Sequence, residues 1–299
     1  MGCTLCPRAC GVKRSEGPGY CLAPEKLLVG SIVIHRGEEP PLVHGAGSGT
    51  IFFSGCPLKC SYCQNMQISH HAIGHVLSPG DLARHMKRLQ DMGSSNINLV
   101  TPIHYTPLIL ESLRSAQDRG MNLPVVVNSG GYEKVSTLKH WKDHADIYLM
   151  DLKYGDNAIG GKLSDAPDYW DIAREAIAFL FESAGPLRTD QDGAAVSGLM
   201  VRHLVLPGML SNPFSALEFL AGLSLEIPIS IMSQYNPCFY QGDISDMRRA
   251  LLEEEYEVVL ERACELGFST IFSQDMDAND AYMPDFDGSR PFGDQPRLL

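Results

Sequence analysis

The chain has 299 residues, of which 44% are hydrophobic and 20% are charged, and its net charge is −12. This length suits one large α/β domain with a full core, and the composition is ordinary for a globular protein. The acidic balance argues against a nucleic-acid substrate, because phosphate binding needs a basic face. No apolar run is long enough to cross a membrane and the first residues lack the apolar centre of a signal peptide, so we expect a cytoplasmic protein without a membrane partner.

The first 26 residues contain a cysteine cluster that is interrupted by Gly and Pro, namely Cys3, Cys6, Cys10 and Cys21. So short a segment cannot bury enough apolar surface to fold alone, and a bound metal would solve that problem. Four cysteines that begin with C-x2-C match a structural zinc site in ligand count. A second iron–sulfur cluster and four reduced thiols packed against the rest of the protein are the alternatives. Residues 27–54 are predicted to form an extended pair of strands, and residues 1–49 a separate N-terminal part.

A second group of cysteines follows a short apolar strand at residues 51–53. After Gly55 come Cys56, Cys60 and Cys63, at spacings of four and three. This spacing suits a cuboidal [4Fe–4S] cluster, in which each thiolate binds one iron and the fourth iron is left open. The loop therefore predicts a cluster that can accept a small molecule at its free iron.

From residue 50 to residue 275 strands and helices alternate. Strands are predicted at 51–53, 97–100, 125–127, 147–150, 199–206, 227–232 and 268–272. Helices are predicted from Ser78-Pro79, from Thr106-Pro107, and at 133–142, 167–184, 211–222 and 246–266, with a linker at 185–198. Such alternation favours a parallel sheet in a partial or full barrel, and residues 276–299 are predicted to form an irregular tail. Cys238 and Cys264, outside both cysteine groups, are expected to be buried.

Polar side chains follow most of the predicted strands. Active sites of βα barrels lie on the loops at the carboxyl ends of strands, so these side chains are candidates for a binding site. They are Thr101, His104, Asn128, Ser129, Asp151, Lys153 and, on the next strand, Arg202. An ion pair between Asp151 and Lys153 that serves only stability, and a purely structural pairing of Arg202 with an acid, are the alternatives.

The cysteine loop, C-x3-C-x2-C with Tyr62 before the last cysteine, resembles that of the radical S-adenosylmethionine (radical SAM) superfamily. The span from about Leu27 to Asp275 resembles the activating-enzyme branch, whose type member activates pyruvate formate-lyase. The N-terminal cysteines and Gly47-Ser48-Gly49-Thr50 resemble a sub-branch that carries such a cysteine cluster. The resemblance implies a partial (β/α)6-type TIM barrel of the radical SAM kind. It also implies that SAM chelates the open iron and is split by one electron into a 5′-deoxyadenosyl radical.

The same resemblance implies roles for the strand-end residues. Lys153, in the match to a D-x-K motif, approaches SAM, and Arg202 grips its methionyl carboxylate. Asn128 and Ser129 lie near the ribose, and Tyr62 packs near the cluster and the adenine. The glycine–glycine–acid motif that binds the SAM amine in the family is absent, and Thr101-Pro102-Ile103-His104 stands in its place. The Thr101 hydroxyl is the candidate replacement, and His104 is expected to be a hydrogen-bonding site residue.

We therefore predict a radical SAM oxidoreductase with a [4Fe–4S] cluster, SAM and, at the N-terminal cysteines, zinc as its cofactors. The resemblance favours a glycine on a partner protein, a glycyl radical enzyme, as the substrate, and a flavodoxin or ferredoxin as the electron donor. One alternative is a radical SAM enzyme that acts on a small molecule or a peptide. The other is an iron–sulfur electron carrier without enzymatic activity.

Overall fold

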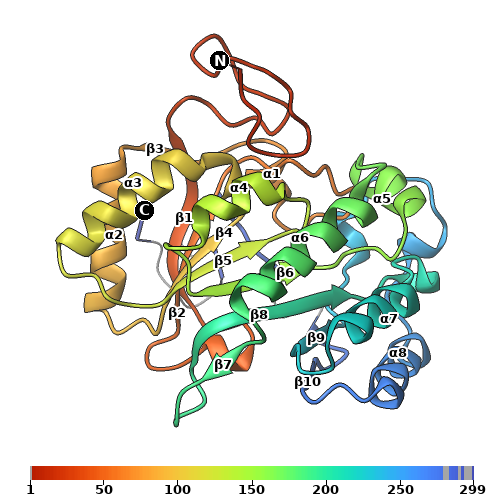
Figure 1. The fold of residues 1–299 in the computed structure, drawn as a ribbon. Helices are drawn as coiled ribbons and strands as arrows, with labels where there is room; N and C mark the ends of the chain where they lie inside the picture. The colour runs from red at the N-terminus through yellow and green to blue at the C-terminus, as the bar shows by residue number, and fades with distance from the viewer. Residues whose placement is uncertain (1, 279–282, 289–290, 293–297) are drawn as a thin grey trace.

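The computed structural model describes residues 2–278, 283–288, 291–292 and 298–299. Its core is an open, mostly parallel sheet with the strand order β10-β9-β8-β6-β5-β4-β2-β1-β3 (Figure 1). β2, β5, β6 and β9 are buried along their whole length, as is typical of a parallel sheet covered on both faces. The parallel strands are β2 (Ser48–Phe53), β4 (Ile97–Val100), β5 (Val125–Ser129), β6 (Ile147–Asp151), β8 (Ala195–Leu204), β9 (Ile229–Met232) and β10 (Ile271–Ser273).

One edge of the sheet is antiparallel. β1 (Leu27–His35) pairs with β2, with His35 opposite Ser48, and the short β3 (His75–Leu77) pairs with the other side of β1. The predicted extended pair is thus present. Because β1 runs against β2, the loop after β1 and the loop after β2 lie at opposite ends of the sheet. β3 and β10 end the strand order, so the sheet stays open and the predicted partial barrel is confirmed.

Helices follow the parallel strands and pack on the outside of the sheet (Figure 1). Such strand–helix–strand units place the helix across the sheet face. Ser78 caps the first long helix as predicted: its hydroxyl accepts from the Asp81 N–H, and the Asp81 carboxylate accepts from the Ser78 N–H, each at 3.1 Å. The long helices are α2 (Pro79–Asp91), α3 (Thr106–Asp118), α6 (Tyr169–Ala184), α7 (Pro213–Leu223) and α8 (Glu253–Leu266).

Several shorter elements differ from the prediction. The helix expected at 133–142 is a single turn, α4 (Val135–Leu138), which continues as a 3-10 turn. α5 (Asn157–Ser164) was not predicted, because Gly160 and Gly161 weaken its helical pattern. Gly160 is needed there, since a Cβ would stand 2.7 Å from the Tyr169 Cβ. The remaining short elements are α1 (Met66–Ser69), β7 (Arg188–Thr189) and the 3-10 turns Pro40–Leu42, Ile103–Tyr105, Lys139–Trp141, Pro207–Met209, Pro237–Phe239 and Asp246–Arg248.

The N-terminal segment, residues 2–26, has neither helix nor strand and projects from one end of the sheet (Figure 1). Hydrogen bonds and apolar contacts attach it to the barrel, and its Cys21 and Ala23 belong to the main core. Thr137 Oγ1 donates to the Leu5 carbonyl at 2.7 Å, and Arg8 Nε donates to the Pro57 carbonyl at 2.9 Å. The Arg8 guanidinium also lies over the Tyr132 ring, 5.2 Å from its centroid. The segment is therefore tied both to α4 and to the cysteine loop.

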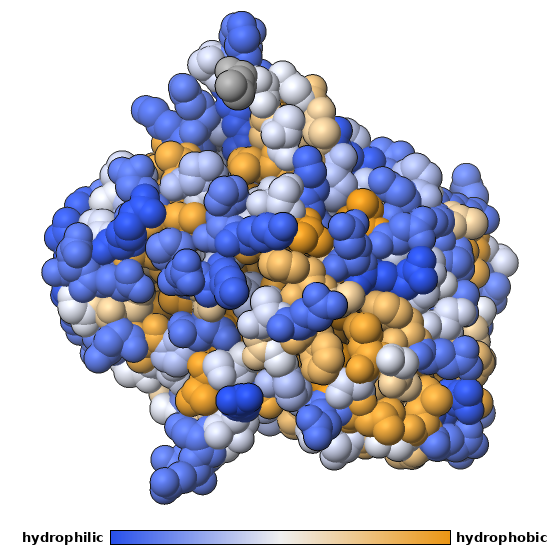
Figure 2. All heavy atoms as spheres, viewed as in Figure 1, coloured by the Kyte–Doolittle hydropathy of each residue, from blue (hydrophilic) through white to orange (hydrophobic). Residues whose placement is uncertain are grey.

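The described C-terminal residues lie against the open edge of the barrel. Phe286 and Phe292 contact the ring of Phe52 on β2, with centroids 5.4 Å and 5.0 Å away. The remainder of the predicted tail lies outside the described residues. Cys238 and Cys264 are exposed, so the expectation that they are buried is wrong. In Figure 2 polar side chains cover the tip of the N-terminal segment, and apolar side chains gather around α7. None of the helices in the described part is long and apolar enough to cross a membrane.

Candidate active site

The cysteine loop begins directly after β2 and is fixed by the N-terminal segment. Gly55 has φ +82°, a left-handed conformation, and a Cβ at this position would stand 2.2 Å from the carbonyl oxygen of Cys21. The same carbonyl accepts a hydrogen bond from the Cys56 N–H at 3.1 Å. The two cysteine groups are thus joined through one backbone carbonyl, and only glycine fits at the point of contact.

We expect Gly55→Ala to destabilise the protein by about 3 kcal/mol, because both the backbone strain and the clash with Cys21 have to be relieved. Gly120→Ala is the matched control. Gly120 has φ +83°, yet no atom lies within 4 Å of the position of its Cβ, so this variant should lose only about 1 kcal/mol from strain alone. Urea unfolding of both variants measures the difference. Equal losses would mean that the contact with the N-terminal segment contributes nothing.

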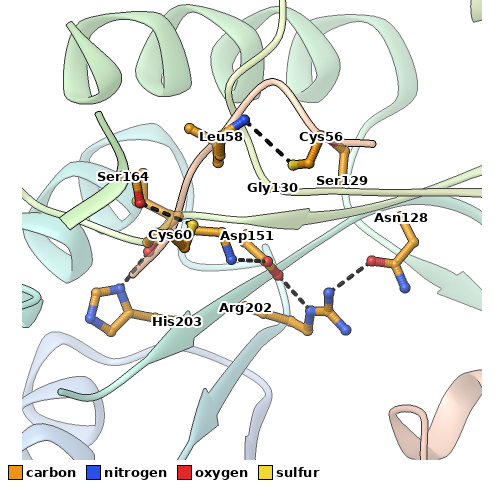
Figure 3. Close-up of polar contacts among 12 residues, drawn as sticks. Cys56, Leu58, Cys60, Asn128, Ser129, Gly130, Asp151, Ser164, Arg202 and His203 are labelled. Atoms are coloured by element: carbon orange, nitrogen blue, oxygen red, sulfur yellow. Dashed lines mark hydrogen bonds and ion pairs between the residues drawn. The ribbon is translucent and has the colours of Figure 1, made fainter. Parts of the chain in front are cut away.

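The three thiols of the loop each contact a polar group, and Figure 3 shows the contacts of Cys56 and Cys60. The Leu58 N–H donates to Cys56 Sγ at 3.4 Å, Ser164 Oγ donates to Cys60 Sγ at 2.9 Å, and Ser69 Oγ lies 3.2 Å from Cys63 Sγ. Burial raises the pKa of the Cys56 and Cys63 thiols, and neighbouring loop cysteines raise it further. Bare thiolates are therefore unfavourable here, whereas iron cations would compensate their charge. Donors to sulfur are also typical of ligated thiolates, so the donor set fits an iron–sulfur cluster.

A chain of buried hydroxyl groups ends in a hydrogen bond to the Cys60 sulfur. The Tyr62 and Tyr154 hydroxyls lie 2.8 Å apart, and the Tyr154 and Ser164 hydroxyls lie 2.6 Å apart. Ser164 in turn donates to Cys60 Sγ. Tyr62, predicted near the cluster, is thus linked to one of the cluster thiols through two buried hydroxyls. α5, which ends at Ser164, positions this chain.

The N-terminal thiols have a different environment. Arg14 Nη2 lies 3.4 Å from Cys3 Sγ and 4.0 Å from Cys21 Sγ. Burial raises the pKa of Cys6 to about 11. Burial also acts to raise the pKa of the exposed Cys10, but backbone hydrogen bonds and Arg14 together outweigh it and lower that pKa. Within the described chain no three His, Cys, Asp or Glu side chains converge as the ligands of a single metal ion do. The structure therefore gives no support to the predicted zinc ion at these cysteines.

A cavity of about 1100 Å³, including its open mouth, lies beside the cysteine loop. Its walls combine the loop with the carboxyl ends of β5, β6, β8 and β9. This is the end of a parallel sheet at which ligands bind. The sequence-predicted residues that it brings together are Cys60, Tyr62, Cys63, Asn128, Asp151, Lys153 and Arg202.

Asp151 is the centre of the charges in this cavity (Figure 3). Its carboxylate accepts from Lys153 Nζ at 2.6 Å and from Arg202 Nε at 2.7 Å, and Arg202 Nη2 donates to Asn128 Oδ1 at 2.8 Å. Burial opposes the ionisation of Asp151, but Arg202 and Lys153 outweigh it and hold its pKa below the usual range. A backbone contact fixes the turn, since the Lys153 N–H donates to the Tyr169 hydroxyl at 2.8 Å. The pairing of Arg202 and Lys153 with Asp151, left open by the sequence, is thus present.

Four predicted residues do not line the cavity. Cys56 is one of them, since only Cys60 and Cys63 of the three loop thiols belong to its lining. His104 is buried and its Nε2 donates to the Ser54 carbonyl at 3.1 Å, and burial lowers its pKa to about 3, so it is neutral. Ser129 donates its hydroxyl to the buried carboxylate of Glu133. Thr101 has φ +56°, a strained conformation for a β-branched residue, and its N–H donates to the Asn128 carbonyl at 2.8 Å. The last three residues support the loops around the cavity from outside.

Two functional candidates were missed. Glu38 and Glu39, on the loop after β1, line the same cavity, and Oε2 of each lies 3.6 Å from Arg202 Nη1. Burial raises the pKa of Glu39 to about 7, against the effect of Arg202. The sequence Glu38-Glu39-Pro40-Pro41 was interpreted only as a loop. The signal that could have found it is a pair of adjacent acids in the connection between two apolar strands, since acids that become buried there need a partner.

An open parallel βα sheet, with three thiols on the loop after its first parallel strand and a charged cavity beside them, defines a partial-barrel protein suited to an iron–sulfur cluster. Residues 50–189 match the model of the Radical SAM superfamily. The chain is also 31% identical over 280 residues to an uncharacterized protein of Methanocaldococcus jannaschii, across 90% of this chain and 76% of that protein. The chain belongs to the radical SAM superfamily. SAM binding, an iron–sulfur cluster and enzymatic catalysis follow from this membership.

A second relative supports the predicted activating-enzyme-like branch. It is the pyruvate formate-lyase-activating enzyme of Clostridium pasteurianum, 27% identical over 130 residues, which are 42% of this chain. The chain covers 53% of that enzyme, or about half its length. Similar solved structures include a domain of a pyruvate-formate lyase-activating enzyme from Bacteroides vulgatus (TM-score 0.44, 15% identity, 61% of this chain and 100% of that chain). Another is native anSMEcpe with bound AdoMet (TM-score 0.49, 12% identity, 74% of this chain and 61% of that chain).

Proposed function

We propose that this protein cleaves SAM reductively and uses the resulting radical to take a hydrogen atom from a glycine on a partner protein. The observation that supports this most is the cysteine loop, whose Cys60 and Cys63 line one cavity together with Asp151, Lys153 and Arg202. When bound, the [4Fe–4S] cluster supplies one electron to SAM, whose carbon–sulfur bond breaks to give methionine and a 5′-deoxyadenosyl radical. Hydrogen transfer from the glycine Cα then leaves 5′-deoxyadenosine and a glycyl radical.

In this proposal the residues of the chain bind and orient. Cys56, Cys60 and Cys63 hold the cluster, and the hydroxyl chain behind Cys60 keeps water from that thiol. Lys153 and Arg202 orient the methionyl end of SAM, while Asp151 holds both cations in place. Asn128 meets the ribose from the strand next to Asp151. Thr101, Ser129 and His104 do not line the cavity and only support the loops around it. A contact between the Thr101 hydroxyl and the SAM amine therefore requires the backbone at Thr101 to change its conformation.

The experiment uses the full-length protein, reconstituted anaerobically with iron and sulfide and reduced with dithionite. We expect SAM to be converted to 5′-deoxyadenosine and methionine. A glycyl radical enzyme with α-deuterated glycine, added to the reaction, should pass deuterium into the 5′-deoxyadenosine. Product without deuterium transfer would contradict the protein substrate and favour the second candidate, a radical SAM enzyme that acts on a small molecule or peptide. The observation in favour of that candidate is the pair of acids in the cavity wall.

We further propose a metal at Cys3, Cys6, Cys10 and Cys21, as zinc or a second iron–sulfur cluster. The observation in its favour is the ligand count, four free cysteines within 19 residues. Iron and zinc are counted per chain in the anaerobic protein and in the Cys6→Ser variant. A metal at this site should be lost from the variant, and unchanged counts would contradict the proposal. For the radical SAM activity we also propose a flavodoxin or ferredoxin as the electron donor and a cytoplasmic location.

A further inference from the structure

The cavity holds more buried acid than buried base. Its lining contains the carboxylates of Glu38, Glu39 and Asp151 and the cations of Lys153 and Arg202. All five side chains are at most 20% exposed. When all five are ionised, the wall carries one surplus negative charge. Buried charge without a partner is unfavourable, so a surplus of this kind is relieved either by a bound proton or by a counter-ion.

The surplus is located at the two glutamates. Asp151 takes the close contacts of both cations, at 2.6 Å and 2.7 Å. Glu38 and Glu39 share one nitrogen of Arg202, at 3.6 Å, which is too far for a hydrogen bond. Glu39 Oε2 is buried and receives no hydrogen bond from the residues that the structure describes. An orphaned carboxylate oxygen of this kind points to a donor that belongs to a ligand.

We propose that Glu38 and Glu39 bind a cationic group of the substrate, an ammonium or a guanidinium. The inference rests on the proposed function in one respect, which is that SAM occupies the cysteine end of the cavity. The glutamates enter from the loop after β1, which starts at the end of the sheet opposite the cysteine loop, and each lies 3.6 Å from Arg202. We infer that a second molecule, and not SAM, brings the cation to them. It carries its positive charge either as a free amine or guanidine or on a basic side chain next to the reacting glycine.

A second hollow leads to the same two glutamates. It measures about 780 Å³ and shares Gly37, Glu38, Glu39 and Gln274 with the first cavity. Asp275 and Asp277 also line it, and among the described lining residues there is no Lys, Arg or His. A wall of one charge sign raises the local concentration of ions of the opposite sign. The second hollow thus favours the approach of a cation and disfavours that of an anion.

Binding of a cation should depend on pH. Burial raises the pKa of Glu39 to about 7, while Arg202 lowers it and Glu38 raises it. The charged groups that face Glu39 are Glu38, Asp151 and Arg202, and His35 is neutral because burial lowers its pKa to about 4. Near neutral pH Glu39 is thus partly protonated without a ligand, and a cation displaces that proton. Affinity should rise from about pH 6 to about pH 8 as the carboxylate forms.

The test measures binding rather than turnover. Butylammonium, butylguanidinium and N-acetyl-Gly-Arg-amide are titrated by calorimetry into the reconstituted full-length protein with SAM bound. Butanol and N-acetyl-Gly-norleucine-amide are the neutral probes, and Glu39→Gln and Glu38→Gln are the variants. Glu111→Gln, an exposed change on α3, is the control. We expect the cationic probes alone to bind, and to bind at least about tenfold more weakly to Glu39→Gln, since a hydrogen bond to a charge is lost.

Binding of the peptide but not of the small cations would assign the charge to a basic side chain, and the reverse would assign it to a free amine or guanidine. Either result supports the subsite. Neutral probes that bind equally well, or cation binding unchanged in both variants, would overturn it. So would a loss of SAM affinity in Glu39→Gln that matches the loss of cation affinity, because the acid would then serve SAM. Failure to form 5′-deoxyadenosine while the cation still binds would count against the proposed function and not against this subsite.

Discussion

Replacement of Cys60 by alanine is expected to reduce the formation of 5′-deoxyadenosine from SAM to background. Cys60 is the buried member of the loop cysteines, and its sulfur accepts a hydrogen bond from Ser164 at 2.9 Å. Without it a second iron of the cluster, besides the one that is open to SAM, has no protein ligand, so the cluster should fail to assemble or should bind SAM poorly. Product is quantified by chromatography, and the reduced cluster is followed by electron paramagnetic resonance with and without SAM.

Cys264→Ala is the matched control for this prediction. Cys264 lies exposed on α8, away from both cysteine groups, and its removal should leave cluster and product unchanged. Wild-type levels of product from Cys60→Ala would contradict the assignment of the cluster to this loop. A cluster signal in the wild type that does not respond to SAM would instead favour the electron-carrier alternative.

Asp151→Asn is expected to destabilise the protein by about 3 kcal/mol, because it leaves Lys153 and Arg202 buried without their close carboxylate. Urea unfolding at neutral pH measures the loss. The folded-state pKa of Asp151 is lowered, so its stabilisation is present above the ordinary carboxyl pKa and is lost as the pH falls through the folded-state value. The difference between wild type and variant should therefore shrink in acid.

Two other isosteric changes, Asp171→Asn and Glu39→Gln, are compared with Asp151→Asn. Asp171→Asn alters an exposed acid that also contacts an arginine, Arg174 at 2.8 Å, and should change stability by less than about 1 kcal/mol. Glu39→Gln lies in the same cavity as Asp151 but removes the surplus charge, so the ligand-free variant should be more stable than the wild type. The two cavity variants are thus expected to differ in sign. A loss of stability in Glu39→Gln equal to that in Asp151→Asn would mean that Glu39 is an ordinary partner of Arg202.

The features that could be predicted from the sequence depend on local pattern and on the geometry of parallel sheets. Alternating strands and helices place the ends of β5, β6 and β8 side by side, so Asn128, Asp151 and Arg202 were expected to meet before any contact was known. The cysteine spacing also defines its own loop, because all three thiols lie within eight residues of one another. Neither inference needs information about how distant segments pack.

The features that were missed depend on packing between distant segments. Nothing in Glu38-Glu39-Pro40-Pro41 shows that the loop turns beneath the sheet to reach Arg202, more than 160 residues later. Thr101 and Ser129 were placed at strand ends correctly, but the direction of their side chains follows from a left-handed turn and from a buried Glu133. α5 was missed because the reason for Gly160 is a contact with Tyr169 of the next helix.

The position of β8 bears on how the molecule could be shortened. The family match ends at residue 189, yet β8 begins at Ala195 and lies between β6 and β9, in the middle of the sheet. A fragment cut to the matched span would expose the bare edge of β6, a template for aggregation through strand pairing. It would also lose Arg202 and, at the other side, the β1 hairpin that carries the glutamates. The smallest fragment that can fold on its own is therefore larger than residues 50–189, the span that matches the family.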